Sequence, residues 1–295
     1  MTKGAPARPD DGTFPTWGAL LAEARRRLPP PEHPAFEAEE LLARATGRPR
    51  AWFHARRGEK APEADVRAFR ALVGRRAAGE PLQYLLGEWE FLGRTFHVDP
   101  RALIPRGETE GVVEASRLAA PSARRILDLG TGSGILAVTL ALERPGASIV
   151  ALDRSERALA LARENAVRHG VDGRVRFLAS DWLSALRPSR PFSLAVANPP
   201  YVPAGDAPHI EKTVSEHEPP LALYGGANGL DPLRRLLRDL PPYLAAGAPF
   251  IFEFGYGQAR DASDLVEASG AFRLVAVRLD AAGIPRTATA LRTAR

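Results

Sequence analysis

The clearest chemical motif in the chain is Asn198-Pro199-Pro200-Tyr201, which follows an apolar stretch. A planar NH2 nitrogen, in an amide or an adenine amine, is a poor nucleophile because its lone pair is delocalised. The Asn198 side-chain oxygen and the Pro199 carbonyl could accept both hydrogens of such a nitrogen. Pro200 stiffens the turn, and Tyr201 could pack on the flat substrate group. The motif predicts methylation of such a nitrogen, achieved mainly by alignment and electrostatic stabilisation.

A glycine-rich loop supplies the second motif, because residues 127–134 read LDLGTGSG where a buried strand turns into a helix. Its spacing is G-x-G-x-G, whereas the dinucleotide fingerprint is G-x-G-x-x-G. Asp128 would repel a pyrophosphate but could accept a hydrogen bond from an ammonium group, which S-adenosylmethionine carries. We therefore predict a cofactor-binding loop made of Asp128, Gly130, Thr131, Gly132, Ser133 and Gly134.

Acidic residues end the next two predicted strands. Asp153 could accept both hydroxyls of a ribose. Asp181 could accept from an adenine amino group, and Trp182 could stack on the ring. Each acid alone could equally be a helix cap or a turn residue. Three successive strand ends of this kind favour a nucleoside cofactor, with Asn198 at its border.

Alternating strand and helix patterns from Arg125 onward predict an α/β sheet that positions these motifs. The last two strands are joined only by a turn, so they must be antiparallel. This arrangement is typical of methyltransferase sheets rather than dehydrogenase sheets. The predicted strands are 125–129, 148–153, 175–179, 193–197, 249–254, 273–279 and 287–292, and the predicted helices are 135–143, 156–169, 230–244 and 258–269.

The chain divides by pattern into four parts. Residues 1–15 are rich in Pro, Gly and Asp and predict a disordered tail. Residues 16–80 carry apolar stripes at helical spacing and predict a small helical bundle. Residues 81–100 predict a β-hairpin linker, and residues 101–295 form the sheet domain. Residues 202–222 favour a solvated loop, with ordering on substrate binding as the alternative.

Composition narrows the function classes. The 295 residues contain no cysteine, which excludes disulfides, thiolate zinc sites and cysteine nucleophiles. The six histidines have no metal-ligand spacing, so no metal is expected. The N-terminal residues have no apolar core and do not predict a secretion signal, which favours a cytoplasmic protein. The net charge of +5 is modest for strong nucleic-acid binding.

Beyond these motifs, the sequence from about residue 81 to 292 resembles the release factor glutamine methyltransferases, the HemK/PrmC family. The resemblance rests on the motifs above and on the segments PLQY (81–84), LIPR (103–106), ETE (108–110), SDW (180–182) and GIPR (283–286). Gly107 departs from the family, which usually has Pro there.

The resemblance implies a Rossmann-like class I fold and S-adenosyl-L-methionine as methyl donor, with S-adenosyl-L-homocysteine as product. It implies methylation of the glutamine in the Gly-Gly-Gln loop of class I peptide chain release factors. The helical domain would dock that partner, and Arg106 and Glu108 would lie near the cleft. A ribosomal-protein glutamine methyltransferase, a DNA adenine methyltransferase and a non-catalytic ribosome adaptor stay as alternatives. We expect a monomer that binds neither membranes nor nucleic acid strongly.

Overall fold

The computed structural model describes residues 14–28 and 34–294. The tail expected at residues 1–15 therefore lies outside the described residues, apart from Phe14 and Pro15. The chain forms two compact units, Met1–Leu86 and Gly87–Arg295, and all the predicted site residues belong to the second. Among the residues that are described, no helix is both long enough and apolar enough to cross a membrane.

The first unit is a bundle of short helices, as predicted. The Thr16 hydroxyl caps its first helix by accepting from the Ala19 amide. Trp17 and Phe53 are fully buried and meet edge to face, while Trp52 is half-buried beside them. The helices are α1 (Trp17–Arg27), α2 (Pro34–Thr46), α3 (Arg50–Ala55), α4 (Glu63–Ala77) and α5 (Leu82–Leu86).

Helix α5 corrects part of the prediction of a hairpin linker over residues 81–100. Leu82 and Leu85 are one helical turn apart, and both are buried in α5, which packs on α2 and α4. The hairpin is confined to β1 (Glu88–Phe91) and β2 (Arg94–His97), in the second unit. Leu92 and Gly93 both have positive φ, which suits a tight two-residue hairpin turn.

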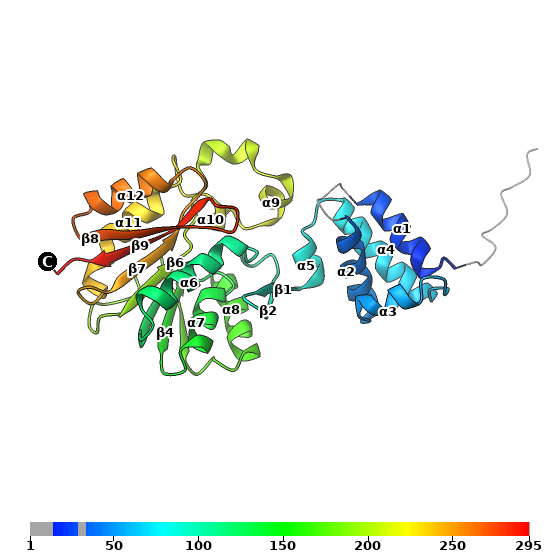
Figure 1. Ribbon diagram of the computed structural model, residues 1–295, viewed down its shortest axis with the longest axis horizontal. Helices are drawn as coiled ribbons and strands as arrows, with labels where there is room; N and C mark the ends of the chain where they lie inside the picture. Colours follow the sequence, from blue (N-terminus) through cyan, green and yellow to red (C-terminus); the bar gives the residue numbers. More distant parts are fainter. Residues whose placement is uncertain (1–13, 29–33, 295) are drawn as a thin grey trace, which may run out of the picture. The chain divides into compact units, whose positions relative to one another are not determined.

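The second unit is built on a seven-stranded sheet with the order β5-β4-β3-β6-β7-β9-β8 (Figure 1). Neighbouring strands from β5 to β7 are parallel, and β9 runs antiparallel to both β7 and β8. The predicted parallel sheet with an antiparallel terminal hairpin is confirmed. The strands are β3 (Arg125–Leu129), β4 (Ser148–Asp153), β5 (Val175–Ala179), β6 (Leu194–Ala197), β7 (Pro249–Glu253), β8 (Phe272–Leu279) and β9 (Pro285–Arg292).

Helices cover both faces because alternate strand residues point to opposite sides. Ile126 of β3 belongs to the apolar cluster under α6 and α7, whereas its neighbour Leu127 belongs to the cluster under α11 and α12. The helices of this unit are α6 (Glu110–Ala119), α7 (Ile135–Glu143), α8 (Glu156–Arg168), α9 (Lys212–His217), α10 (Pro220–Leu223), α11 (Asp231–Asp239) and α12 (Ala259–Ala268), and the 3-10 turns are η1 (Gly107–Thr109), η2 (Ala204–His209) and η3 (Pro241–Tyr243).

One predicted helix is shorter than expected, and one predicted loop contains short helices. The helix expected over 230–244 ends at Asp239, and η3 follows, because Pro241 and Pro242 cannot continue the α-helical hydrogen bonds. Residues 202–222, expected as a solvated loop, contain η2, α9 and most of α10. Glu218 within this segment is buried, which shows that the segment packs onto the unit.

Candidate active site

A cavity of about 300 Å³ opens at the carboxyl ends of β3, β4, β5 and β6, where open α/β sheets bind ligands. The structure brings most of the predicted residues to its wall. Those that line it are Gly130, Thr131, Gly132, Ser133, Asp153, Asp181, Trp182, Asn198 and Pro200. Four predicted residues do not: Asp128, Gly134, Pro199 and Tyr201.

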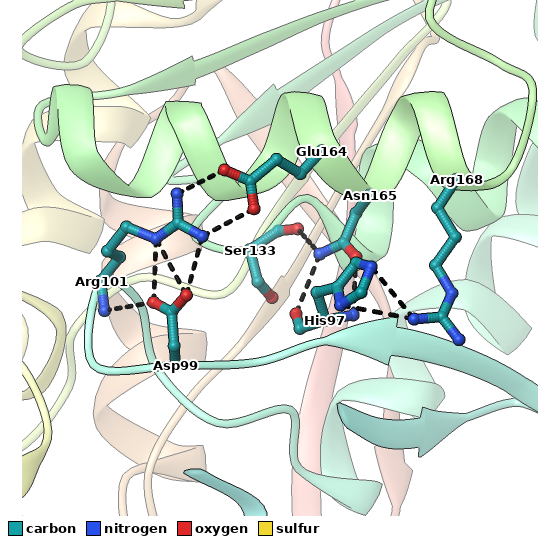
Figure 2. A network of polar contacts seen from close by, with 7 residues as sticks. All are labelled: His97, Asp99, Arg101, Ser133, Glu164, Asn165 and Arg168. Carbon is teal, nitrogen blue, oxygen red and sulfur yellow. Dashed lines mark hydrogen bonds and ion pairs between the residues drawn. The ribbon is translucent and has the colours of Figure 1, made fainter. Parts of the chain in front are cut away.

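The glycine loop lies close against helix α8. Gly134 has φ +83°, and a Cβ there would come within 2.9 Å of the Ala162 Cβ, so only glycine fits. The amide of buried Asn165 donates to the Ser133 carbonyl at 2.9 Å. Asn165 also exchanges hydrogen bonds with the His97 backbone, at 2.7 and 3.1 Å. One side chain therefore ties the loop to the β1–β2 hairpin, as Figure 2 shows.

Helix α8 also fixes Arg101, a residue that lines the cavity, through Glu164 (Figure 2). The Arg101 guanidinium donates to both oxygens of Glu164, at 2.6 and 2.7 Å, and to Asp99 at 2.7 to 3.0 Å. These hydrogen bonds raise the pKa of Arg101, and the one to Glu164 lowers the pKa of that carboxyl. Arg101 is thereby fixed in the wall of the cavity as a permanent cation.

Asp128 does not lie where a contact with a ligand ammonium group would require it. It shares the face of β3 with Ile126 and points toward α7, so its side chain is fully buried away from the cavity. Its Oδ2 accepts from the Thr131 hydroxyl at 2.6 Å and from the Ala137 amide at 3.1 Å. Burial raises the pKa of Asp128 to about 7. Asp128 therefore braces the loop and caps the first turn of α7.

Asp153 stands where the ribose contact was expected. Its Oδ2 accepts from the Gly132 amide and its Oδ1 from the Ser155 amide, both at 2.8 Å. Each carboxylate oxygen keeps a further lone pair, and the residue lines the cavity. Burial raises the pKa of Asp153 against the opposing effect of these hydrogen bonds. The same carboxylate can therefore hold the loop and accept from two ligand hydroxyls.

Asp181 and Trp182 differ in how they meet the cavity. Asp181 is exposed, and its Oδ2 accepts from Arg235 at 2.8 Å, so its side chain already has a cationic partner. Trp182 has a positive φ of 53°, which is a strained backbone conformation for a bulky residue. Its ring lies 3.6 Å from the position of a Cβ on Gly130. The glycine loop and the indole thus form adjoining surfaces.

The Asn-Pro-Pro-Tyr turn is held by a glycine-rich segment and by Gln258. A Cβ on Gly225 would come within 2.4 Å of the Pro200 carbonyl oxygen, and one on Gly229 within 2.0 Å of the Tyr201 carbonyl oxygen. The Gln258 amide donates to that Tyr201 oxygen at 2.8 Å. The backbone of the glycine segment packs so closely against the turn that the turn is fixed in one conformation.

Behind Asn198, three side chains form a hydrogen-bonded row. Asn198 Nδ2 donates to the Thr109 hydroxyl at 2.9 Å, and that hydroxyl donates to Glu253 Oε2 at 2.7 Å. The Tyr201 hydroxyl donates to Glu253 Oε1 at 3.1 Å. Thr109 and Glu253 are each only 1% exposed. Burial raises the pKa of Glu253 to about 7 and also raises that of Tyr201.

One rim of the cavity is made by the segment 103–106 and the segment that follows η2. Buried Glu218 accepts from the Ile104 amide at 3.0 Å and pairs with Arg106. Arg106 lines the cavity, as expected, whereas Glu108 does not. The ion pair between Arg106 and Glu218 joins two segments that are more than a hundred residues apart in the chain.

Several positioning residues escaped the sequence-based prediction. Thr109 lies in the quoted ETE segment without an assigned role, and Asn165 and Gln258 have no local signature. Glu253 had a usable signal, because an acid that ends the apolar strand PFIFE must find partners when buried. The assembled cleft combines a backbone loop, a hydroxyl-accepting carboxylate and an oriented amide, which suits transfer between a nucleoside-bearing ligand and a polar acceptor.

Family comparisons divide the chain in the same way as the fold. Residues 19–87 match the PrmC N-terminal domain, and residues 113–216 match the methyltransferase small domain. Among solved structures, a methyltransferase from Pyrococcus furiosus is 14% identical, with a TM-score of 0.52 over 69% of this chain and 91% of that one. The hMettl16 catalytic domain is 12% identical, with a TM-score of 0.55 over 77% and 92%. These likenesses confirm the methyltransferase fold.

Curated relatives are more similar in sequence. The chain is 41% identical to the release factor glutamine methyltransferase of Geobacter sulfurreducens, over 81% of this chain and 83% of the relative. It is 43% identical to that of Moorella thermoacetica, over 92% and 97%. The protein of the same name from Bordetella pertussis is 42% identical, over 88% and 95%.

Proposed function

The chain belongs to the release factor glutamine methyltransferase family, and from this premise we propose that it methylates the side-chain amide of the glutamine in the Gly-Gly-Gln motif of class I peptide chain release factors. The observation that carries the proposal is the position of Asn198. Its amide lines the same cavity as the glycine loop and Asp153, with its nitrogen turned to Thr109. The opposite amide atom, Oδ1, is left to accept from a substrate.

The cavity fits S-adenosylmethionine on three observations. The loop residue Gly132 has φ +55° and nothing within 4 Å of a Cβ position, so its backbone is open to a ligand. Asp153 retains acceptor capacity for two ribose hydroxyls. Trp182 offers an aromatic face beside the loop. When bound, the cofactor supplies a methyl group on a cationic sulfur, and its transfer leaves S-adenosylhomocysteine and one proton.

The residues of this chain act on the glutamine amide by orientation. Asn198 Oδ1 and the Pro199 carbonyl accept its two N–H bonds, which favours a pyramidal nitrogen with the lone pair directed at the methyl group. Charge develops on that nitrogen during transfer, and the two acceptor dipoles stabilise it. The Tyr201 hydroxyl is held by Glu253, which fixes the far end of the turn. No strong base is needed before attack.

The first unit serves in this proposal to dock the release factor. It matches the PrmC N-terminal domain, so the family resemblance that implies docking extends to this unit. A monomeric state, a cytoplasmic location and the absence of strong nucleic-acid binding stay predictions.

The test is a transfer assay with labelled S-adenosylmethionine, a purified class I release factor, and a matched release factor in which the Gly-Gly-Gln glutamine is replaced by asparagine. Label on the glutamine amide of the first protein and none on the second is the expected result. Parallel reactions contain ribosomal proteins and duplex DNA as the alternative acceptors. Absence of label on the release factor, with cofactor binding intact, overturns the proposal.

A further inference from the structure

The polarity of the Asn198 amide is decided by the residues behind it. A carboxylate only accepts hydrogen bonds, and a threonine hydroxyl has one proton. Because Thr109 gives that proton to Glu253, its remaining lone pair requires a donor from Asn198. Only Nδ2 of Asn198 can satisfy it. Oδ1 therefore faces away from Thr109, and among the described residues none donates to it.

This polarity matters because the two ends of an amide have nearly the same shape. If the amide turned over, Asn198 would present its NH2 group to the N–H bonds of a substrate amide. Two donors would then meet, and the substrate nitrogen would lose one of its acceptors. Packing alone distinguishes the two orientations poorly, whereas the buried hydroxyl and carboxylate distinguish them by hydrogen bonding.

We propose that Thr109 and Glu253 are positioning residues which lock the Asn198 amide with its oxygen toward the acceptor nitrogen. The inference rests on the proposed function and deepens it. Thr109 borders the cavity, but its hydroxyl is already engaged by Glu253 and Asn198, so we assign neither residue a hydrogen bond with the substrate. They act through Asn198, and Glu253 also holds the Tyr201 hydroxyl, so one carboxylate sets both ends of the Asn-Pro-Pro-Tyr turn.

The ionised state of Glu253 is what makes the row one-directional. The charged and titratable groups that face it are Glu108 from η1, Tyr201, and Arg286 from β9. Burial raises the pKa of Glu253 to about 7, against the hydrogen bonds from Thr109 and Tyr201. Glu108 adds to the rise, and Arg286 opposes it. Protonated Glu253 can donate to Thr109, whose own proton can then turn to Asn198 and draw Oδ1 inward. Acid therefore weakens the acceptor without unfolding the site.

The first experiment compares T109V, which keeps the shape but removes the hydroxyl, with T109S, which keeps the hydroxyl. Methyl transfer to the release factor and the Kd for S-adenosylhomocysteine are measured on each full-length protein. We expect kcat to fall by about 10- to 100-fold in T109V and by less than about threefold in T109S, with Kd changed less than about threefold in both. Equal kcat in T109V and wild type overturns the inference.

The second experiment uses the pH profile of E253Q and so does not depend on how T109V folds. The wild-type kcat should decline on the acid side of about pH 7, and E253Q should have a lower kcat with no such decline. An unchanged acid decline in E253Q overturns the inference. If wild type itself transfers no methyl group to the glutamine, the proposed function fails, and this result is distinct from either outcome above.

Discussion

The cleft has a cofactor half, formed by the glycine loop and Asp153, and an acceptor half, formed by the Asn-Pro-Pro-Tyr turn. Different kinds of contact hold the two halves in place. In the cofactor half, the loop amides of Gly130 and Thr131 both donate to the Leu152 carbonyl, and Asp153 accepts from Gly132, 21 residues away. In the acceptor half, a row of side chains orients Asn198 across longer separations. Asn198 and Thr109 are 89 residues apart, and Thr109 and Glu253 are 144 apart.

Because their contacts differ, we expect the two halves to fail separately. Damage to the cofactor half should weaken cofactor binding, because the loop backbone is itself the binding surface. Damage to the acceptor half should leave cofactor affinity nearly intact and lower kcat, because its side chains only orient the nucleophile. Four substitutions test whether the halves are as independent as their contacts indicate.

Asn198→Ala should have the largest effect, since it removes an acceptor that stabilises developing charge. We expect kcat to fall on the order of 10²–10³-fold while the Kd for S-adenosylhomocysteine rises by less than about tenfold. Transfer assays and calorimetry provide the two numbers. Wild-type turnover in this variant would show that Asn198 does not stabilise the reacting nitrogen.

Gly134→Ala attacks the cofactor half. The new Cβ meets Ala162 at 2.9 Å while the backbone holds φ +83°, so the free energy of unfolding should fall by about 3 kcal/mol and cofactor affinity should drop with it. Gly170→Ala is the matched control, because Gly170 has φ +65° but nothing within 4 Å. Urea unfolding that gives the two variants equal losses would show that the contact with α8 is unimportant.

Gln258→Ala removes the side chain that holds the Tyr201 carbonyl. We expect kcat to fall by about tenfold with little change in cofactor Kd. The substitution removes the hydrogen bonds that Gln258 makes with the Tyr201 and Asn228 carbonyls and with the Gly255 amide, so the turn gains freedom. Steady-state kinetics with both substrates varied measures this. A rise in cofactor Kd that matched the loss in kcat would mean that the two halves are coupled.

Asp128→Asn should change stability rather than turnover, and its effect appears as a pH dependence. Burial raises the pKa of Asp128 to about 7 from 3.8, so the folded protein binds that proton more tightly than the unfolded chain. The resulting stability is present at low pH and is lost as pH rises through 7. Between pH 5 and 8, wild type should lose about 2 kcal/mol more than Asp128→Asn in chemical unfolding. Identical pH slopes would contradict this assignment.

The same contrast explains what the sequence could predict. The glycine loop, Asp153 and the Asn-Pro-Pro-Tyr turn are short motifs at predicted strand ends, and topology alone brings strand ends together. Asp128 was misplaced because strand alternation turns it toward α7, away from the cavity. Asp181 lies at the cavity as expected, but its pairing with Arg235, 54 residues later, has no local signal.

In the acceptor half, only the Asn-Pro-Pro-Tyr motif could be predicted from the sequence, and the residues that support it could not. Thr109 meets Asn198, and Glu253 meets Thr109, only once the chain has folded and β7 has paired with β6. No spacing rule links these three residues. Likewise, the short helices at 204–223 and buried Glu218 depend on a contact with Ile104 that is 114 residues distant. Proline-rich polar sequence resembles a loop until such a partner is known.

The proposed mechanism requires the Asn198 oxygen and the Pro199 carbonyl to hold the substrate amide facing the methyl donor. A crystal structure of the full chain with S-adenosylhomocysteine and a Gly-Gly-Gln peptide tests this directly. We expect Asn198 Oδ1 and the Pro199 oxygen each within hydrogen-bond distance of the glutamine amide nitrogen, and Nδ2 still on Thr109. An Asn198 side chain turned away from that amide, or bound to it through Nδ2, would refute this mechanism.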